Sequence, residues 1–273
     1  MISIADPLNW ASVTERFYAL PPDLWRENMD ASVSILGRMI RKFERRARLT
    51  DADLAALQGL PVRQQVFEAG RYIVREGSSP DHSALILSGI AYRHKVTVDG
   101  ARQIVAMHIA GDFVDLEGAL LRVADHNVQA LTRCEVALVP TNALRALLDA
   151  HSNLAVAMWI DTLIDGSIFR EWIVNVGRRD ARARIAHLLC EFARRLEVAG
   201  LADPGGYQLP MTQEQLADAT GLTAVHVNRT LKALERDGLV VRHRRFVDIP
   251  VWQHLRDVAG FNELYLHLDQ VAA

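Results

Sequence analysis

The sequence predicts an α+β protein in which a small antiparallel β-roll precedes a long helix and a C-terminal helical region with a β-hairpin. Two changes of hydrophobic period carry this prediction. From Val62 to Pro140, short runs rich in β-branched and aromatic residues are separated by glycines, as in antiparallel strands that close on themselves. After Pro140 the apolar residues recur at three- and four-residue steps, which indicates helices.

We divide the chain of 273 residues into four segments, because single cores rarely keep growing beyond roughly 250 residues. Residues 1–38 form an N-terminal extension, 39–150 the β-roll domain, 151–177 the long helix and 178–273 the C-terminal domain with its tail. The extension either packs on the β-roll through its aromatic side chains or is a dispensable segment ahead of an internal start at Met39. We favour the second explanation.

The composition is that of an ordinary globular protein, with 50% hydrophobic and 23% charged residues. No run approaches the ~18 apolar residues that a membrane helix needs, and the first residues lack the features of a secretion signal. We therefore expect a cytoplasmic protein without a membrane partner. The segment between Arg178 and Arg256 holds more cations than acids although the net charge is −2, which suits a DNA-binding domain joined to an acidic one.

Neither a metal, a cofactor nor an enzymatic activity is predicted. Cys134 and Cys190 are too few for a structural zinc or an iron–sulfur cluster, and both lie in apolar runs where a buried, inert thiol is expected. The sequence contains no glycine-rich phosphate loop, no nucleophile elbow and no metal-ligand spacing.

The long helix carries an apolar stripe at helical spacing. A helix between two domains buries only part of such a stripe on its own chain, so we expect the rest to pair with a second copy in a homodimer. The alternative is a helix that packs only on the β-roll. The side chains assigned to the dimer interface are Val156, Ile160, Leu163, Ile164, Ile168 and Trp172.

The most specific pattern begins at Met211 and reads MTQEQLADATGLTAVHVNRTLKALERDGLV. Thr212 and Gln215 form a capping box for a first helix, which ends at Gly221. Thr223 caps a second helix, and an apolar triplet forms the buried side of that helix. This combination predicts a helix-turn-helix, and the basic hairpin VVRHRRFVDIP that follows would be its wing.

The other side of the second helix displays Val225 with three cations and no acid. A recognition helix has this character, because its early turns reach base edges in the major groove and its later cations meet phosphates. Arg229 has the length and the fork to contact O6 and N7 of a guanine. The alternative is that this side of the helix is an ordinary solvated surface that does not bind DNA. The side chains assigned to DNA contact are Thr212, Thr223, Ala224, Val225, His226, Asn228, Arg229, Lys232, Arg242 and Arg244.

These features together resemble the Crp/Fnr family of bacterial transcription regulators, over roughly Met39 to Ile249. The resemblance rests on GDFVDL from Gly111, on CEVALVP from Cys134 and on the helix-turn-helix. It implies a jelly roll of the cyclic-nucleotide-binding type, a dimerisation helix and a winged helix-turn-helix. It further implies a homodimer on a two-fold operator in double-stranded DNA, with RNA polymerase as a partner.

The resemblance does not extend to the family's known effectors. Members that bind cyclic AMP hold its phosphate with a Gly-Glu pair and an Arg-Ser pair. The corresponding positions in this chain are Asp115, Leu116, Ala124 and Asp125. These positions supply carboxylates and no arginine, so a cyclic nucleotide is not expected, and an unidentified small-molecule effector is left open.

The other effectors of the family have even less support. The cysteine cluster of the oxygen-sensing branch does not occur before Cys134. Haem is a weak alternative based on His94, His108 and His126, which as strand residues are more often surface or hydrogen-bonded side chains.

DNA reading is expected to differ from the family in one position. Many members have Glu where Val225 stands, and a valine can only touch a thymine methyl group. We therefore predict a sequence-specific transcription regulator with the family's guanine contact but not its full operator. The alternative is an effector-binding or interaction module of the same fold that does not read DNA, which the acid-free helix face disfavours.

Overall fold

The computed structural model describes residues 36–203 and 206–268. The predicted extension therefore lies outside the described residues except for its last three. Leu36 is buried in the core and the first described helix, α3, spans Gly37–Glu44, so the sequence-based boundary at Met39 omits a core side chain. Residues from Leu36 onward form one compact unit.

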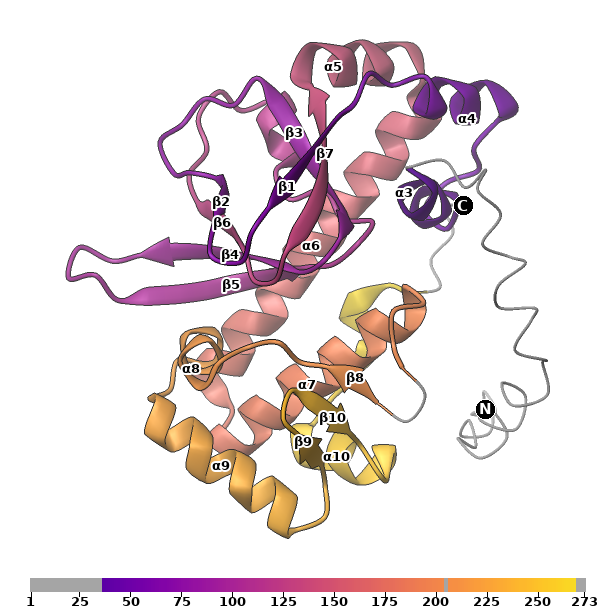
Figure 1. The fold of residues 1–273 in the computed structure, drawn as a ribbon. Helices are drawn as coiled ribbons and strands as arrows, with labels where there is room; N and C mark the ends of the chain where they lie inside the picture. The colour runs from indigo at the N-terminus through magenta and orange to yellow at the C-terminus, as the bar shows by residue number, and fades with distance from the viewer. Residues whose placement is uncertain (1–35, 204–205, 269–273) are drawn as a thin grey trace, which may run out of the picture. The chain divides into compact units, whose positions relative to one another are not determined.

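The β-roll consists of two antiparallel sheets that face each other (Figure 1). One has the strand order β1-β7-β3 and the other β2-β6-β4-β5. An Asp-Gly turn, Asp99-Gly100, joins β4 to β5, and Gly100 has a φ of +87°, a conformation that glycine adopts without strain. The strands are β1 (Arg63–Phe67), β2 (Tyr72–Val74), β3 (His82–Ser88), β4 (Ala91–Val96), β5 (Arg102–His108), β6 (Asn127–Ala130) and β7 (Cys134–Pro140).

Short helices accompany the β-roll, and one long helix leaves it. The short ones are α4 (Asp51–Gln58), the 3-10 helix η1 (Leu116–Ala119) and α5 (Thr141–Ala150). The long helix α6 (Ser152–Arg178) packs against α3 and α5 near its start, and it also contacts α7 and the C-terminal tail (Figure 1).

The C-terminal domain is a winged helix-turn-helix, as predicted. Its helix α7 (Ala181–Val198) supports α8 (Gln213–Thr220) and α9 (Ala224–Arg236), and a small antiparallel sheet has the order β8-β10-β9. The strands are β8 (Tyr207–Gln208), β9 (Val241–His243) and β10 (Phe246–Asp248), and the tail holds α10 (Trp252–Ala259) and the 3-10 helix η2 (Glu263–Leu266). The sequence-based fold class is therefore confirmed.

The cysteines and histidines can be compared with what the sequence predicts for them. Both cysteines are buried free thiols, as expected, and burial raises the pKa of Cys134 to about 11. The histidines His94, His108 and His126 are all buried, and of the two predicted settings, surface or hydrogen-bonded, His126 has the second, with Asp125 as its partner at 2.7 Å. Burial lowers the pKa of His94 to about 4 and that of His108 well below its ordinary value, so both rings are neutral.

Candidate nucleic-acid interface

The helix-turn-helix is fixed by its caps. The backbone amide of Gln215 donates to the Thr212 hydroxyl at 3.1 Å, and the Thr212 amide donates to the Gln215 side-chain oxygen at 2.9 Å. Gly221 ends α8 in the left-handed conformation, with a φ of +63°. The Thr223 hydroxyl then accepts from the His226 amide at 3.2 Å. Both threonine hydroxyls therefore satisfy their own helix ends, each worth about 1 kcal/mol to the fold.

The inner sides of the two helices are buried together. Leu216 and Ala217 of α8 lie against Val227, Leu231 and Leu234 of α9, and all five side chains are nearly inaccessible to solvent. Full burial of a Leu or Val side chain contributes roughly 1.5–3 kcal/mol. This packing holds α9 rigidly, so its outer face is a preformed surface.

The outer face of α9 carries cations that the fold does not use. Arg229 and Lys232 are exposed, and neither forms a hydrogen bond or an ion pair with any other described residue. Val225 is 81% exposed in the first turn of α9, while Ala224, His226 and Asn228 are half-buried beside it.

The wing separates two arginines that the sequence had grouped together. Arg244 lies at the turn between β9 and β10, exposed and with a φ of +58°. Arg242 instead donates through Nε and Nη2 to the two carboxylate oxygens of Glu235, at 2.8 and 3.2 Å. The Arg242 guanidinium thus already attaches the wing to α9, and its assignment to DNA contact stays a prediction.

The apolar stripe predicted on α6 divides into two faces. Ile164, Ile168 and Trp172 are buried against α7 and the residues around it, so they belong to the core of their own chain. This corrects their assignment to a dimer interface: the C-terminal domain packs on that side of the helix. Ile160 is half-buried against the same cluster.

A second stripe on α6 remains uncovered. Val156, Trp159, Leu163, Ile173 and Val174 are exposed large apolar side chains. Val156, Trp159 and Leu163 are separated by three and four residues, and Ile173 lies at the same alternating spacing two heptads after Trp159. The sequence analysis missed Trp159 and Ile173. The strict 3-4 alternation, which differs from the spacing of the buried stripe, would have identified them.

The effector positions of the β-roll hold two carboxylates and two apolar side chains. Asp115 is 2% exposed, and its Oδ1 accepts from the Ala84 amide at 2.7 Å. Burial raises the pKa of Asp115 to about 7. Asp125 is exposed and bonds the ring of His126 at 2.7 Å, while Leu116 and Ala124 are half-buried and apolar.

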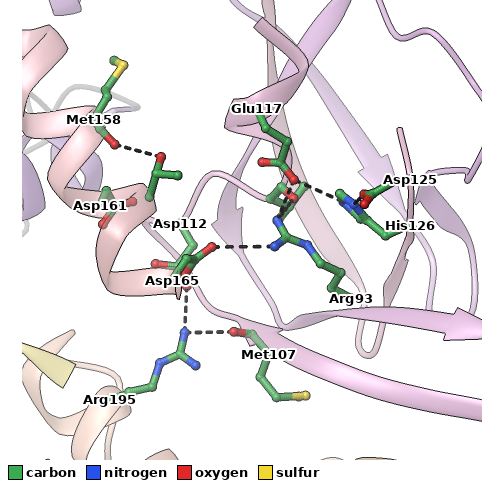
Figure 2. Close-up of polar contacts among 12 residues, drawn as sticks. Arg93, Met107, Asp112, Glu117, Asp125, His126, Met158, Asp161, Asp165 and Arg195 are labelled. Atoms are coloured by element: carbon green, nitrogen blue, oxygen red, sulfur yellow. Dashed lines mark hydrogen bonds and ion pairs between the residues drawn. The ribbon is translucent and has the colours of Figure 1, made fainter. Parts of the chain in front are cut away.

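The arginine buried inside this part of the β-roll is already neutralised. Arg93 lies 3.3 Å from Glu117, 3.8 Å from Asp165 of α6 and 2.6 Å from the carbonyl oxygen of Val114 (Figure 2). His126 lies 3.6 Å from the same Glu117 carboxylate. These partners occupy the positive charge that a phosphate would need.

The part of the chain that the structure describes offers neither a metal site nor a membrane span. No group of three or more His, Cys, Asp or Glu side chains in it is arranged to hold a metal ion. None of the helices in residues 36–203 and 206–268 is long and apolar enough to cross a membrane.

Known proteins match both domains of this chain. The model of the cyclic nucleotide-binding domain matches residues 64–151, and that of the Crp-like helix-turn-helix domain matches residues 183–258. The transcriptional activator protein FnrL of Cereibacter sphaeroides is 29% identical over 218 residues, which cover 78% of this chain and 87% of FnrL. The fumarate and nitrate reduction regulatory protein of Escherichia coli is 24% identical over 214 residues, 78% of this chain and 84% of that protein.

A solved structure agrees with these sequence matches. FixK2 from Bradyrhizobium japonicum superposes with a TM-score of 0.69 at 25% identity, and the match covers 74% of this chain and 100% of FixK2. The match thus extends over the β-roll, the long helix and the helix-turn-helix together.

Proposed function

Because this chain belongs to the Crp/Fnr family and is a DNA-binding transcription regulator, we propose that it acts as a homodimer on a two-fold operator. The support for the dimer is the exposed stripe of Val156, Trp159 and Leu163, continued by Ile173. Apolar side chains at alternating three- and four-residue steps form the seam of paired helices. A two-fold axis along α6 would place one recognition helix in each half-site.

The DNA contact that we propose centres on the outer face of α9. Arg229 reads a guanine, Val225 touches a thymine methyl, and Lys232 meets a phosphate. Arg244 at the tip of the wing reaches the backbone beside the groove. The single observation that carries this proposal is that Arg229 and Lys232 are exposed without a partner in the described structure, whereas Arg242 is bound by Glu235.

Membership in the family also bears on two other binding partners, RNA polymerase and a small-molecule effector. Two relatives bear the name of transcriptional activator, and we extend the proposal to a contact with RNA polymerase. A small-molecule effector, if the protein uses one, would not be a cyclic nucleotide, since Arg93 is neutralised by Glu117 and Asp165. We place the protein in the cytoplasm, where its DNA is.

Selection of bound duplexes from a random DNA library tests this function. The selected sequences should show two-fold symmetry, with half-sites about one helical turn apart. Binding to the selected operator should weaken linearly with the logarithm of salt concentration, because phosphate contacts release counterions. Failure to enrich any sequence, with binding to all duplexes alike, would favour the module that does not read DNA.

The dimer face is tested by two acidic substitutions. Trp159→Glu combined with Leu163→Glu should give monomers by sedimentation and abolish specific DNA binding. The control, Val98→Glu combined with Leu120→Glu, adds the same charge at exposed apolar sites outside α6 and should remain dimeric. A dimer that survives the α6 substitutions would place the interface elsewhere.

A further inference from the structure

A cavity of about 130 Å³ lies away from the effector positions, between α3, the turn after β5, α6, α7 and the tail. Six of the side chains that line it are cations: Arg38, Arg41, Lys42, Arg45, Arg46 and Arg195. Three are acids: Asp112, Asp161 and Asp165. The lining therefore has a formal excess of positive charge, and the pairing of each acid determines where that excess lies.

The three acids form their ion pairs mainly with Lys42, Arg195 and Arg93. Lys42 bonds Asp112 and Asp161, each at 2.8 Å, and this pairing raises the pKa of Lys42. Arg195 of α7 lies 3.2 Å from Asp112 (Figure 2). Asp165 lies near Arg93 of the β-roll, at 3.8 Å. Among the described residues, the one ion pair between an acid of the cavity and an arginine of α3 or of the turn after it is the long contact of 4.0 Å between Asp161 and Arg46.

The arginines of α3 and the turn after it bond neutral carbonyl groups instead. Arg38 donates to the Ala199 carbonyl at 3.0 Å, and Arg45 to that of Val198 at 3.2 Å. Both carbonyls belong to the last turn and cap of α7, whose dipole supplies only about half a negative charge. Arg46 donates to the His267 carbonyl at 2.6 Å. These contacts orient the guanidinium groups but leave most of their charge.

Two arginines retain unused donors. Arg46 is 8% exposed, and its Nε has no hydrogen-bond acceptor in the described structure. Arg41 is exposed and forms no ion pair with any described residue. An unsatisfied donor of a buried guanidinium destabilises the fold, so an acceptor at this place would be favourable.

The cations also repel one another. Arg38, Arg41, Lys42 and Arg45 stand at three- and four-residue steps, so they share one face of α3, where like charges destabilise a helix. Burial and the charge of Arg41 lower the pKa of Arg38, and burial lowers the pKa of Arg46. An anion in the cavity would relieve both effects.

We propose that this cavity binds a small phosphoryl-bearing anion, held by Arg41, Arg45 and Arg46. A tetrahedral phosphoryl group offers three oxygens, which suits guanidinium groups that approach from successive turns of one helix. The anion would bridge α3, next to the β-roll, and the end of α7 in the DNA-binding domain. Such a site is separate from the α9 surface, and it does not depend on DNA reading.

Thermal unfolding with inorganic phosphate and with inorganic pyrophosphate tests the site, with potassium chloride at matched ionic strength as the reference. A ligand that binds only the folded state raises the melting temperature with its concentration. The natural chain should show a saturable rise of several degrees with at least one of the two anions. Response to phosphate itself would indicate a site for the free ion, and response to pyrophosphate alone a site for larger phosphoryl compounds.

Two variants assign the response to the cavity. Arg41→Gln combined with Arg45→Gln should weaken the anion at least tenfold. Arg48→Gln combined with Arg63→Gln removes two exposed cations that do not line the cavity and should leave the response unchanged. Equal weakening in both variants would mean general charge screening and would overturn the proposal, as would the absence of a saturable rise in the natural chain.

A third variant separates this site from the DNA-binding face. Arg229→Gln combined with Lys232→Gln should lose DNA binding and keep the anion response in full. Loss of the response in this variant, with retention in Arg41→Gln/Arg45→Gln, would assign the anion to α9 and refute the cavity. The single variant Arg41→Gln, an exposed position, serves if the double variant fails to fold.

Discussion

The interior of the β-roll and the outer face of α9 use arginine in opposite ways. Arg93 is buried, with two carboxylates and a backbone carbonyl within 4 Å (Figure 2). Arg229 is exposed, and within the described residues it has no partner. A buried charge without a counter-charge is costly, since desolvation costs several kcal/mol per ion. An exposed charge carries no such penalty and stays available to a phosphate or a base.

The comparison separates two meanings of a basic side chain. Arg242 and Arg244 are two residues apart in one hairpin, yet only the second is left without a partner in the described structure. A count of basic residues in the sequence therefore overstates the number of cations that are available to bind DNA. The ion pairs in the fold show which cations are available. Substitution of a paired cation should therefore change mainly the stability of the fold, and substitution of an unpaired cation should change mainly DNA binding.

Removal of the buried cation should have the largest effect. Arg93→Met leaves Glu117 and Asp165 without their cation, and we expect a loss of about 3–5 kcal/mol in the free energy of unfolding. Urea denaturation measures it, with Arg63→Met on the exposed strand β1 as the control. A loss below about 1 kcal/mol would mean that the buried pairing contributes little.

Asp115 should make stability depend on pH. Burial raises its pKa in the folded state from the ordinary 3.8 to about 7. The folded state thus holds this proton more tightly than the unfolded chain, so the contribution is complete below pH 3.8 and is lost as the pH rises toward 7. Asp115→Asn keeps the acceptor for the Ala84 amide without the charge. The free energy of unfolding of the variant should therefore exceed that of the natural protein by an amount that grows with pH. From roughly pH 5 to pH 8 this difference should increase by about 2–3 kcal/mol.

The control for this experiment is a carboxyl on the surface. Asp125 is exposed, and its hydrogen bond to His126 lowers its pKa. Asp125→Asn should not gain stability over the natural protein in that pH range. A parallel pH dependence of Asp115→Asn and the natural protein would show that Asp115 is ionised in the fold at low cost.

Arg229→Ala should weaken the operator complex by about 1–3 kcal/mol and relax the preference for guanine at one position of each half-site. Its free energy of unfolding should not change, because the side chain has no partner in the described fold.

Arg242→Ala should lower the free energy of unfolding by about 0.2–1 kcal/mol, because it removes a half-exposed ion pair, and it should leave the base preference intact. Loss of base preference in both variants would remove the distinction between them.

Lys232→Ala should have the smallest and least selective effect. We expect binding to weaken almost equally on all sequences, and the slope of log K against log salt to fall by about 0.9 for each phosphate that the protein no longer neutralises. Binding measured at several salt concentrations checks both expectations. Arg244→Ala should behave in the same way, since both cations are assigned to phosphates; a change in base preference would move either residue to the groove.

Local patterns predicted most of the fold because each had a local cause. The capping box at Thr212, the left-handed Gly221 and the cap at Thr223 are all present, since each is set by its immediate neighbours. The interface face of α6 was not predictable in the same way. Ile164 and Leu163 are adjacent and equally apolar, and only the packing of α7 determines which is covered. The same holds for Arg242, whose partner Glu235 lies on another element.

The two tryptophans of α6 lie on its two faces, one covered by the chain itself and one exposed. Trp172 is buried, and its indole nitrogen donates to both oxygens of the buried Glu191 carboxylate, at 3.1 and 3.0 Å. Its emission should therefore be blue-shifted, and it should change if the C-terminal domain leaves the helix. Trp159 is 67% exposed and lies on the uncovered stripe, so its emission should be red-shifted until a second helix covers it. In a variant whose three other tryptophans are replaced, α6 would thus report domain docking and the proposed chain pairing by two separate emissions.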